Sequence, residues 1–172
     1  MFNRKLFPAL LASLVLATVA VAPVAASNGP ERVTDTLTGG TQVWAECDGF
    51  DVVLQGLTIE RTFLLWKDAN GNVVVERRHV YFHGPMVNSV TGASAEYIGR
   101  FTRVVDTEAQ TEALIGLSRM IHLPGRGVLT MAAGHIGWDL TLDEEAPPIF
   151  DNGQSLFQFE AEVADALCAA LD

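Results

Sequence analysis

The 172-residue sequence contains few basic residues and none of the short motifs that identify the common classes of catalytic site. Eleven Lys and Arg residues stand against 21 Asp and Glu residues, which gives a formal net charge of −10. A surface this acidic repels phosphate backbones and anionic lipid head groups, so we expect no nucleic-acid partner. The serine-nucleophile motif G-x-S-x-G is absent as well, which removes the usual sequence signal of an α/β-hydrolase.

Glycine and proline gather in one stretch, LPGRGVLTMAAGHIGWDL at residues 123–140, but they do not form a nucleotide-binding motif. The dinucleotide motif G-x-G-x-x-G lacks its third glycine here, and the Lys-Ser or Lys-Thr pair of a P-loop is missing. An L-P-x-T-G anchoring signal fails too, because Arg126 stands where threonine is required. Pro124-Gly125 instead predicts a type II turn between two strands.

The sequence also lacks the residue spacing of a metal site. Its four histidines, at positions 79, 83, 122 and 135, include no H-E-x-x-H motif. DANGN at 68–72 resembles the start of an EF-hand loop, but Val73 and His79 occupy the positions of the required Gly and Glu. We therefore predict a hairpin turn at 68–72, and no metal or other cofactor.

A hydrophobic run follows basic residues at the N-terminus. Arg4 and Lys5 precede the apolar segment 6–21, and Val24-Ala25-Ala26 places small residues at the −3 and −1 positions of a cleavage site. This pattern predicts a signal peptide at 1–26 and a secreted or extracytoplasmic protein. An uncleaved anchor is the alternative, since 6–26 is long enough to span a bilayer. After cleavage we expect one domain, 27–172, with no membrane attachment.

Cysteine is scarce, with Cys47 and Cys168 as the two thiols of the chain. In an oxidising compartment an even number of cysteines favours a disulfide, and this one would close nearly the whole domain into one loop. A pair of reactive thiols is the alternative. Neither residue belongs to a C-x-x-C motif, however, and neither has a histidine beside it in the sequence.

The remainder of the chain alternates between apolar segments and short turns, which is typical of an all-β protein. A change to helical spacing near the end predicts an α-helix at 159–171. Long strands joined by short turns favour an antiparallel meander that closes into a β-barrel, with a β-sandwich as the alternative. The predicted strands are 31–37, 42–47, 50–55, 57–67, 73–83, 94–105, 112–123 and 128–142.

Alternation along three strands predicts which side chains share a face. Apolar residues at 57, 59, 63 and 65 are interrupted by Arg61, and those at 95, 97, 101 and 105 surround Gly99. Residues 113, 115, 117 and 121 form a third apolar set, with Arg119 among them. Glycines inside strands, at 99, 116, 134 and 137, indicate the bends or bulges of a closed barrel.

Polar residues within apolar strand patterns are the candidates for a functional site. They either face solvent or line a polar pocket, because a buried charge is costly unless it is paired. In a pocket, Arg61 could neutralise a ligand carboxylate, while Glu96, Tyr97 or His79 could transfer protons. Tryptophans at 44, 66 and 138 could line an apolar cavity. The candidate ligand-binding residues are Arg61, Trp66, His79, Tyr81, Glu96, Tyr97, Arg100 and Trp138.

CDGFDV starting at Cys47, DANGN at 68–72, NSVTG at 88–92, LPGRG at 123–127 and a near-terminal cysteine resemble a group of small exported bacterial proteins of unknown function. The long-strand meander with its glycine-marked late hairpin is also similar to the allene oxide cyclase and dirigent barrels. That similarity implies an eight-stranded barrel whose hydrophobic cavity binds and steers a reactive ligand. No catalytic motif of that family can be placed on this chain.

Three functions are compatible with the sequence. The first is a secreted barrel that binds a small apolar or amphipathic molecule in its cavity. The second is a cyclase- or isomerase-type enzyme that uses the same cavity. The third is an envelope interaction module with a filled core. The sequence does not identify the ligand, the reaction or the oligomeric state.

Overall fold

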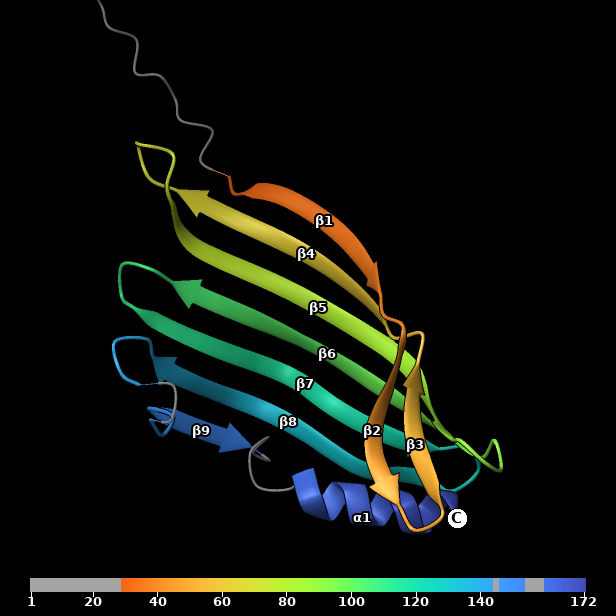
Figure 1. The fold of residues 1–172 in the computed structure, drawn as a ribbon. Helices are drawn as coiled ribbons and strands as arrows, with labels where there is room; N and C mark the ends of the chain where they lie inside the picture. The colour runs from red at the N-terminus through yellow and green to blue at the C-terminus, as the bar shows by residue number, and fades with distance from the viewer. Residues whose placement is uncertain (1–28, 144–145, 154–159) are drawn as a thin grey trace, which may run out of the picture.

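The computed structural model describes residues 29–143, 146–153 and 160–172, so the predicted signal peptide at 1–26 lies outside it. One antiparallel sheet of nine strands and one helix make up the described fold (Figure 1). Its elements are β1 (Glu31–Thr38), β2 (Thr41–Cys47), β3 (Phe50–Gln55), β4 (Thr58–Lys67), β5 (Val73–Asn88), β6 (Ser94–Asp106), β7 (Thr111–Leu123), β8 (Gly127–Asp139), β9 (Phe150–Gly153) and α1 (Glu160–Leu171).

The strand order is that of a meander with one inserted hairpin. Strands β4 to β9 follow one another in space as they do in sequence, and β1 pairs with β4. The β2–β3 hairpin leaves this path, and residues 52–54 of β3 pair with residues 86–88 of β5. Because β4 and β3 pair with successive parts of β5, β5 is 16 residues long and extends beyond its predicted end at residue 83.

The prediction of an antiparallel β-sheet with one C-terminal helix is confirmed. Closure into a barrel is not: within the described ranges, β1 pairs with β4 alone, β9 with β8 alone and β2 with β3 alone, so the sheet keeps open edges. Strand β9 was not predicted from the sequence; it consists of four residues and pairs with Gly134–Gly137 of β8.

The sheet has two chemically different faces. Along β5 the residues Val80, Phe82 and Met86 are buried, whereas the alternating residues His79 and Tyr81 are exposed. We call the side that carries Met86 the helix face, because α1 packs against it, and the opposite side the open face. This period of two follows from the pleat of the strand.

The apolar core lies at the end of the helix face where α1 and the β2–β3 hairpin meet (Figure 1). Three helix residues four apart, Val163, Leu167 and Leu171, supply the buried stripe of α1. Two strand residues, Met86 and Ile121, are fully buried beneath them. The core cluster consists of Ala45, Val52, Leu54, Met86, Ala95, Ile121, Leu123, Val163, Leu167 and Leu171.

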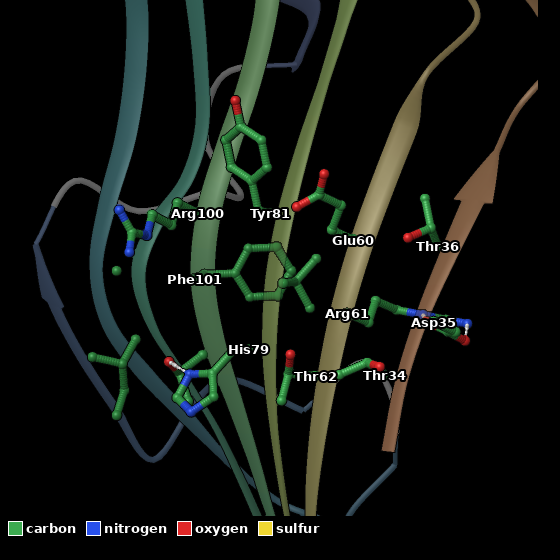
Figure 2. A pocket seen from close by; sticks show the side chains of 14 residues that line it. Thr34, Asp35, Thr36, Glu60, Arg61, Thr62, His79, Tyr81, Arg100 and Phe101 are labelled. Carbon is green, nitrogen blue, oxygen red and sulfur yellow. Dashed lines mark hydrogen bonds and ion pairs between the residues drawn. The ribbon is translucent and has the colours of Figure 1, made fainter. Parts of the chain in front are cut away.

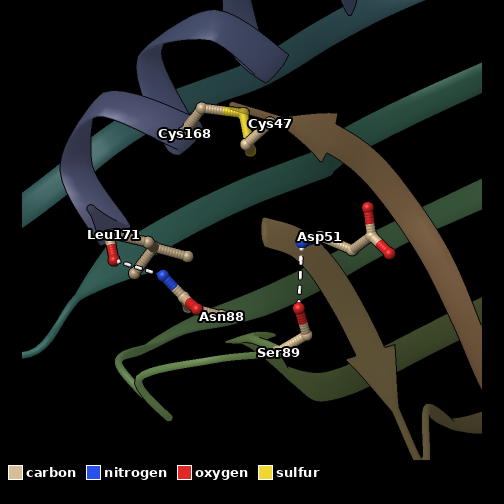
Figure 3. The surroundings of a disulfide bond; sticks show 6 residues. All are labelled: Cys47, Asp51, Asn88, Ser89, Cys168 and Leu171. Carbon is tan, nitrogen blue, oxygen red and sulfur yellow. Dashed lines mark hydrogen bonds between the residues drawn. A yellow bond between two sulfur atoms is a disulfide. The ribbon is translucent and has the colours of Figure 1, made fainter. Parts of the chain in front are cut away.

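Covalent and polar contacts fix α1 on this core. The predicted disulfide between Cys47 and Cys168 is present and joins the end of β2 to the helix, with 5.6 Å between the two Cα atoms (Figure 3). Asn88 is buried and donates from Nδ2 to the carbonyl of Leu171 at 2.9 Å. Arg126 donates to the carbonyl of Ala170 at 2.8 Å. Both bonds satisfy carbonyls that a helix C-terminus leaves without intrahelical partners.

A β-bulge in β7 corrects one of the predicted faces. The pairing with β8 shifts between Leu117 and Arg119, so the side-chain alternation changes at this point. Ile115 and Leu117 therefore lie on the open face, while Arg119 and Ile121 lie on the helix face. The prediction that residues 113, 115, 117 and 121 share one face is wrong, because one extra residue in a strand reverses the direction of every side chain that follows.

Gly99 of β6 lies opposite this bulge. A Cβ atom at position 99 would lie 2.2 Å from the ring of Phe82 and 2.9 Å from the carbonyl oxygen of Ser118. Glycine is required here because no other residue lets the ring and the bulge approach so closely. The expectation that Gly99 marks an irregular point in the sheet is therefore confirmed.

The two turns predicted from composition are also present. Asp68 accepts hydrogen bonds from the amides of Asn70 and Asn72, at 2.8 and 2.9 Å, and so closes the β4–β5 hairpin. At the β7–β8 turn the amide of Arg126 donates to the carbonyl of Leu123 at 3.0 Å, and Gly125 has φ of 74°. A positive φ at the third residue after proline at the second is the geometry of a type II turn.

None of the helices in the described part of the chain is long and apolar enough to cross a membrane.

Candidate functional site

A trough of about 650 Å³ crosses the open face and is lined by five neighbouring strands, β1, β4, β5, β6 and β7. The strand register places its side chains in two rows. One row holds Thr34, Thr62, His79, Thr102 and Ile115, and the other holds Thr36, Glu60, Tyr81 and Arg100. The trough exists on this face because β4, β5 and β6 alternate polar residues with the buried residues of the helix face.

Tyr81 lies at the centre of the trough, between Glu60 and Arg100 (Figure 2). The phenol side chain is 37% exposed, so its ring is accessible to a ligand. Glu60 and Arg100 are exposed, and neither makes a hydrogen bond or ion pair with another described residue. A carboxylate, an aromatic ring and a guanidinium therefore stand on three successive strands, and a molecule that enters the trough could contact all three. The Tyr81 ring also lies 5.4 Å from the His83 ring, centre to centre.

His79 is held by a neighbouring strand. Its Nδ1 lies 2.9 Å from the hydroxyl of Thr102, to which it is directly opposed in the β5–β6 register. This contact orients the imidazole, and the choice of donor depends on the tautomer. The rest of the row is rich in hydroxyl groups, which donate and accept hydrogen bonds equally well.

An ion pair lies behind the β1–β4 side of the trough, on the helix face of the sheet. Arg61 donates from Nε to Asp35 at 2.8 Å, and its terminal nitrogen contacts the second carboxylate oxygen (Figure 2). This hydrogen bond from Arg61 lowers the pKa of Asp35 below its ordinary value. Both charges are already neutralised, so Arg61 is not available to a ligand carboxylate in the way the sequence suggested.

Two further arginines on the helix face are also paired. Arg78 binds Glu76 at 2.6 Å, and Arg103 binds Glu112 at 2.5 Å. The Arg78 guanidinium also lies 4.7 Å from the centre of the Phe63 ring. These half-buried pairs explain why charged residues occur on the face that carries the core, since pairing offsets the cost of removing a charge from water.

The structure brings the side chains of three of the eight predicted ligand-binding residues into the trough: His79, Tyr81 and Arg100. Arg61 lies between the trough residues Glu60 and Thr62 on β4, but its side chain is on the helix face. Glu96 lines a smaller hollow of about 260 Å³ next to it, which also includes Tyr81. The remaining three residues lie elsewhere. Trp66 is on the open face beside Arg77, Tyr97 packs 4.8 Å from the Phe82 ring on the helix face, and Trp138 occupies a helix-face position opposite Glu112.

Sequence reasoning missed Glu60 and the threonines of the trough. Apart from Thr102 on β6, these residues lie on β1 and β4, in the segments TDT at 34–36 and ERT at 60–62. An alternation of polar residues on adjacent strands was the available signal. The sequence alone does not show that β1 and β4 are neighbours, because the β2–β3 hairpin lies between them in the chain.

Within the described ranges, no group of three or more His, Cys, Asp and Glu residues is arranged so that it could hold a metal ion. No known protein family matches the chain, and no curated protein or solved structure is significantly similar to it. The similarity to allene oxide cyclase and dirigent barrels therefore stays a prediction. The proposals that follow depend on the geometry of the trough.

Proposed function

We propose that the protein is exported and binds a small amphipathic molecule in the trough on its open face. The single observation that carries this proposal is the arrangement of Glu60, Tyr81 and Arg100 on three successive strands inside a hollow of about 650 Å³. That volume lies within the range of about 300–1,000 Å³ that is common for small-molecule sites.

Export is supported by two observations. The disulfide between Cys47 and Cys168 fits an oxidising compartment, where such bonds persist. The first 26 residues carry the composition of a signal peptide. The proposal does not require the sheet to close into a barrel, because the trough lies on one face and its described lining ends at β1 and β7.

An amphipathic ligand fits the trough better than a purely apolar one. Tyr81 and Ile115 offer apolar surface, and threonine, glutamate and arginine side chains surround them. A bound hydrocarbon would remove these polar groups from water without giving them hydrogen-bond partners, which opposes binding. A molecule with both kinds of surface avoids this cost.

Native mass spectrometry of the protein purified from its own host tests the proposal. We expect a co-purifying small molecule whose occupancy falls in Tyr81→Ala, because this substitution removes the central ring of the trough. Val90→Ala is the matched control, since Val90 is exposed in the β5–β6 turn and lies outside the trough lining. Repeated absence of a ligand, or equal occupancy in both variants, would contradict binding in the trough.

A further inference from the structure

The chemistry of the trough lining narrows the class of ligand, and this inference rests on the proposed function. Hydroxyl groups dominate one side of the trough, while charged groups and the Tyr81 ring occupy its centre. A polyhydroxylated molecule can donate to and accept from such groups at many points along its length. The hydroxyl groups belong to Thr34, Thr36, Thr62, Thr102 and Tyr81.

The trough is elongated across the strands. Adjacent strands of a sheet lie about 4.8 Å apart, so the four spacings from β1 to β7 span about 19 Å. A linear molecule lying across the sheet would meet Thr36 on β1 and Glu60 on β4, then Tyr81 on β5, and then Arg100 on β6. This length and order suit a short chain of linked rings better than a single compact molecule.

The trough carries a negative charge on one side of Tyr81 and a positive charge on the other. Glu60 and Arg100 lie on strands separated by β5, so their backbones are about 10 Å apart and their side chains do not pair. On the helix face, Arg61, Arg78 and Arg103 each form an ion pair with a carboxylate. Arg100, on the open face, forms no ion pair with a described residue. Arg100 can bind a carboxylate through two parallel hydrogen bonds.

Glu60, unlike Arg100, disfavours an acidic group of the ligand. Its carboxylate accepts hydrogen bonds from hydroxyl groups and repels a second acid, and the net charge of −10 disfavours a uniformly acidic ligand. Tyr81 stands between the two and offers the apolar face of its ring to the apolar face of a sugar. We infer that the trough binds an oligosaccharide in which an acidic sugar on Arg100 adjoins a neutral sugar on Glu60.

Isothermal titration calorimetry with four probes tests this inference. The probes are a tetrasaccharide of alternating glucuronic acid and N-acetylglucosamine, neutral cellotetraose, tetragalacturonate and laurate. We expect the alternating tetrasaccharide to bind most tightly and Arg100→Ala to weaken it by about tenfold or more, as loss of a charge-assisted contact requires. Cellotetraose should bind Arg100→Ala and the wild type equally, and Glu60→Gln should improve the binding of tetragalacturonate.

Arg32→Ala is the matched control, because Arg32 is an exposed arginine on the open face of β1 that does not line the trough. Equal binding of the alternating tetrasaccharide to Arg100→Ala and to Arg32→Ala would overturn the inference. Binding of laurate and of no sugar would overturn it too, while leaving the proposed function intact. If none of the four probes binds, the inference fails, and the mass-spectrometric experiment decides the proposed function independently.

Discussion

Arg119 differs from the other arginines of the helix face because it is buried and has no partner. Its side chain is 6% exposed, and its Nε atom has no hydrogen bond. Among the described residues it forms no ion pair, whereas Arg61, Arg78 and Arg103 each bind a carboxylate. The β-bulge at Ser118 and Arg119 is the cause, since it turns Arg119 toward the core end of the sheet beside buried Ala132.

Replacing Arg119 with methionine should therefore stabilise the protein. Methionine keeps much of the side-chain volume and removes a charge that the interior does not compensate, so we expect the free energy of unfolding to rise by about 1–4 kcal/mol. Urea unfolding measures this difference. Arg103→Met is the matched control, because it leaves the partly buried Glu112 unpaired and should lower the free energy of unfolding. A loss of stability in Arg119→Met would contradict the view that the buried charge of Arg119 is uncompensated.

At the scale of single residues the sequence predicted the alternation but not its interruptions. The positions of Arg61 and Tyr97 on the helix face agree with the apolar patterns in which they occur. Arg119 could not be placed, because a bulge depends on local pairing between two strands and leaves little trace in composition. Glu60 was missed for a related reason, since its neighbours Tyr81 and Arg100 belong to other strands.

At the scale of elements, the β4–β5 hairpin depends on one carboxylate. Asp68 accepts hydrogen bonds from the side chain and backbone of Asn72 and from the backbone and side chain of Asn70, which together lower the pKa of Asp68. These bonds hold the turn between two strands that also supply Glu60, His79 and Tyr81 to the trough. The same residues DANGN predicted the turn correctly, because Asp and Asn bond locally to the backbone that follows them.

The turn should loosen in acid. A carboxylate whose pKa is lower in the folded state adds stability above its unfolded pKa of about 3.9, and this contribution disappears as the pH falls through the folded value. We expect the amides of Asn70 and Asn72 to lose protection from hydrogen exchange over this range. In Asp68→Asn the protection should be lower already at neutral pH and should not change further in acid.

Asp48→Asn provides the comparison, because Asp48 belongs to the β2–β3 turn and takes no part in the hydrogen bonds of Asp68. In Asp48→Asn the protection of the Asn70 and Asn72 amides from hydrogen exchange should depend on pH as it does in the wild type. Unchanged protection in the wild type from neutral pH into the acid range would contradict the role assigned to Asp68.

The element boundaries show where sequence patterns are informative. Strands with turn residues at both ends, such as β3 and β6, were predicted to within one residue. The end of β5 was placed five residues too early, because Gly84 and Pro85 lie inside the strand. The space at Gly84 is tight: a Cβ atom would lie 3.1 Å from the Cα of Leu57, where the chain passes from β3 to β4.

At the scale of the whole molecule, the two faces of the sheet carry different features. The helix face holds the core, the disulfide and the paired charges, and the open face holds the trough. The sequence predicted a long antiparallel sheet and a terminal helix, but it could not show whether the sheet closes, since closure depends on strand tilt and stagger. The predicted interior cavity is accordingly replaced by a hollow on the outside of an open sheet.

This division predicts that the disulfide stabilises the fold without controlling the trough. Cys47 and Cys168 are 121 residues apart, so the bond removes much of the freedom of the unfolded chain. Replacing both with alanine should lower the free energy of unfolding by at most about 4–5 kcal/mol. This limit is the contribution expected from the entropy of the unfolded chain alone. Urea unfolding of this double variant against the wild type, each checked by intact mass, gives the difference.

Hydrogen exchange then shows where the loss occurs. A 12-residue helix is marginal without tertiary contacts, so the amides of α1 should exchange faster in the double variant, with Leu167 and Leu171 still holding the helix on the core. The central amides of β4, β5 and β6 do not pair with the segments that carry Cys47 or Cys168, so they should lose no more protection than the measured fall in the free energy of unfolding, and less than α1 loses. Equal losses of protection in α1 and in β4 to β6 would mean that the helix does not open separately from the sheet.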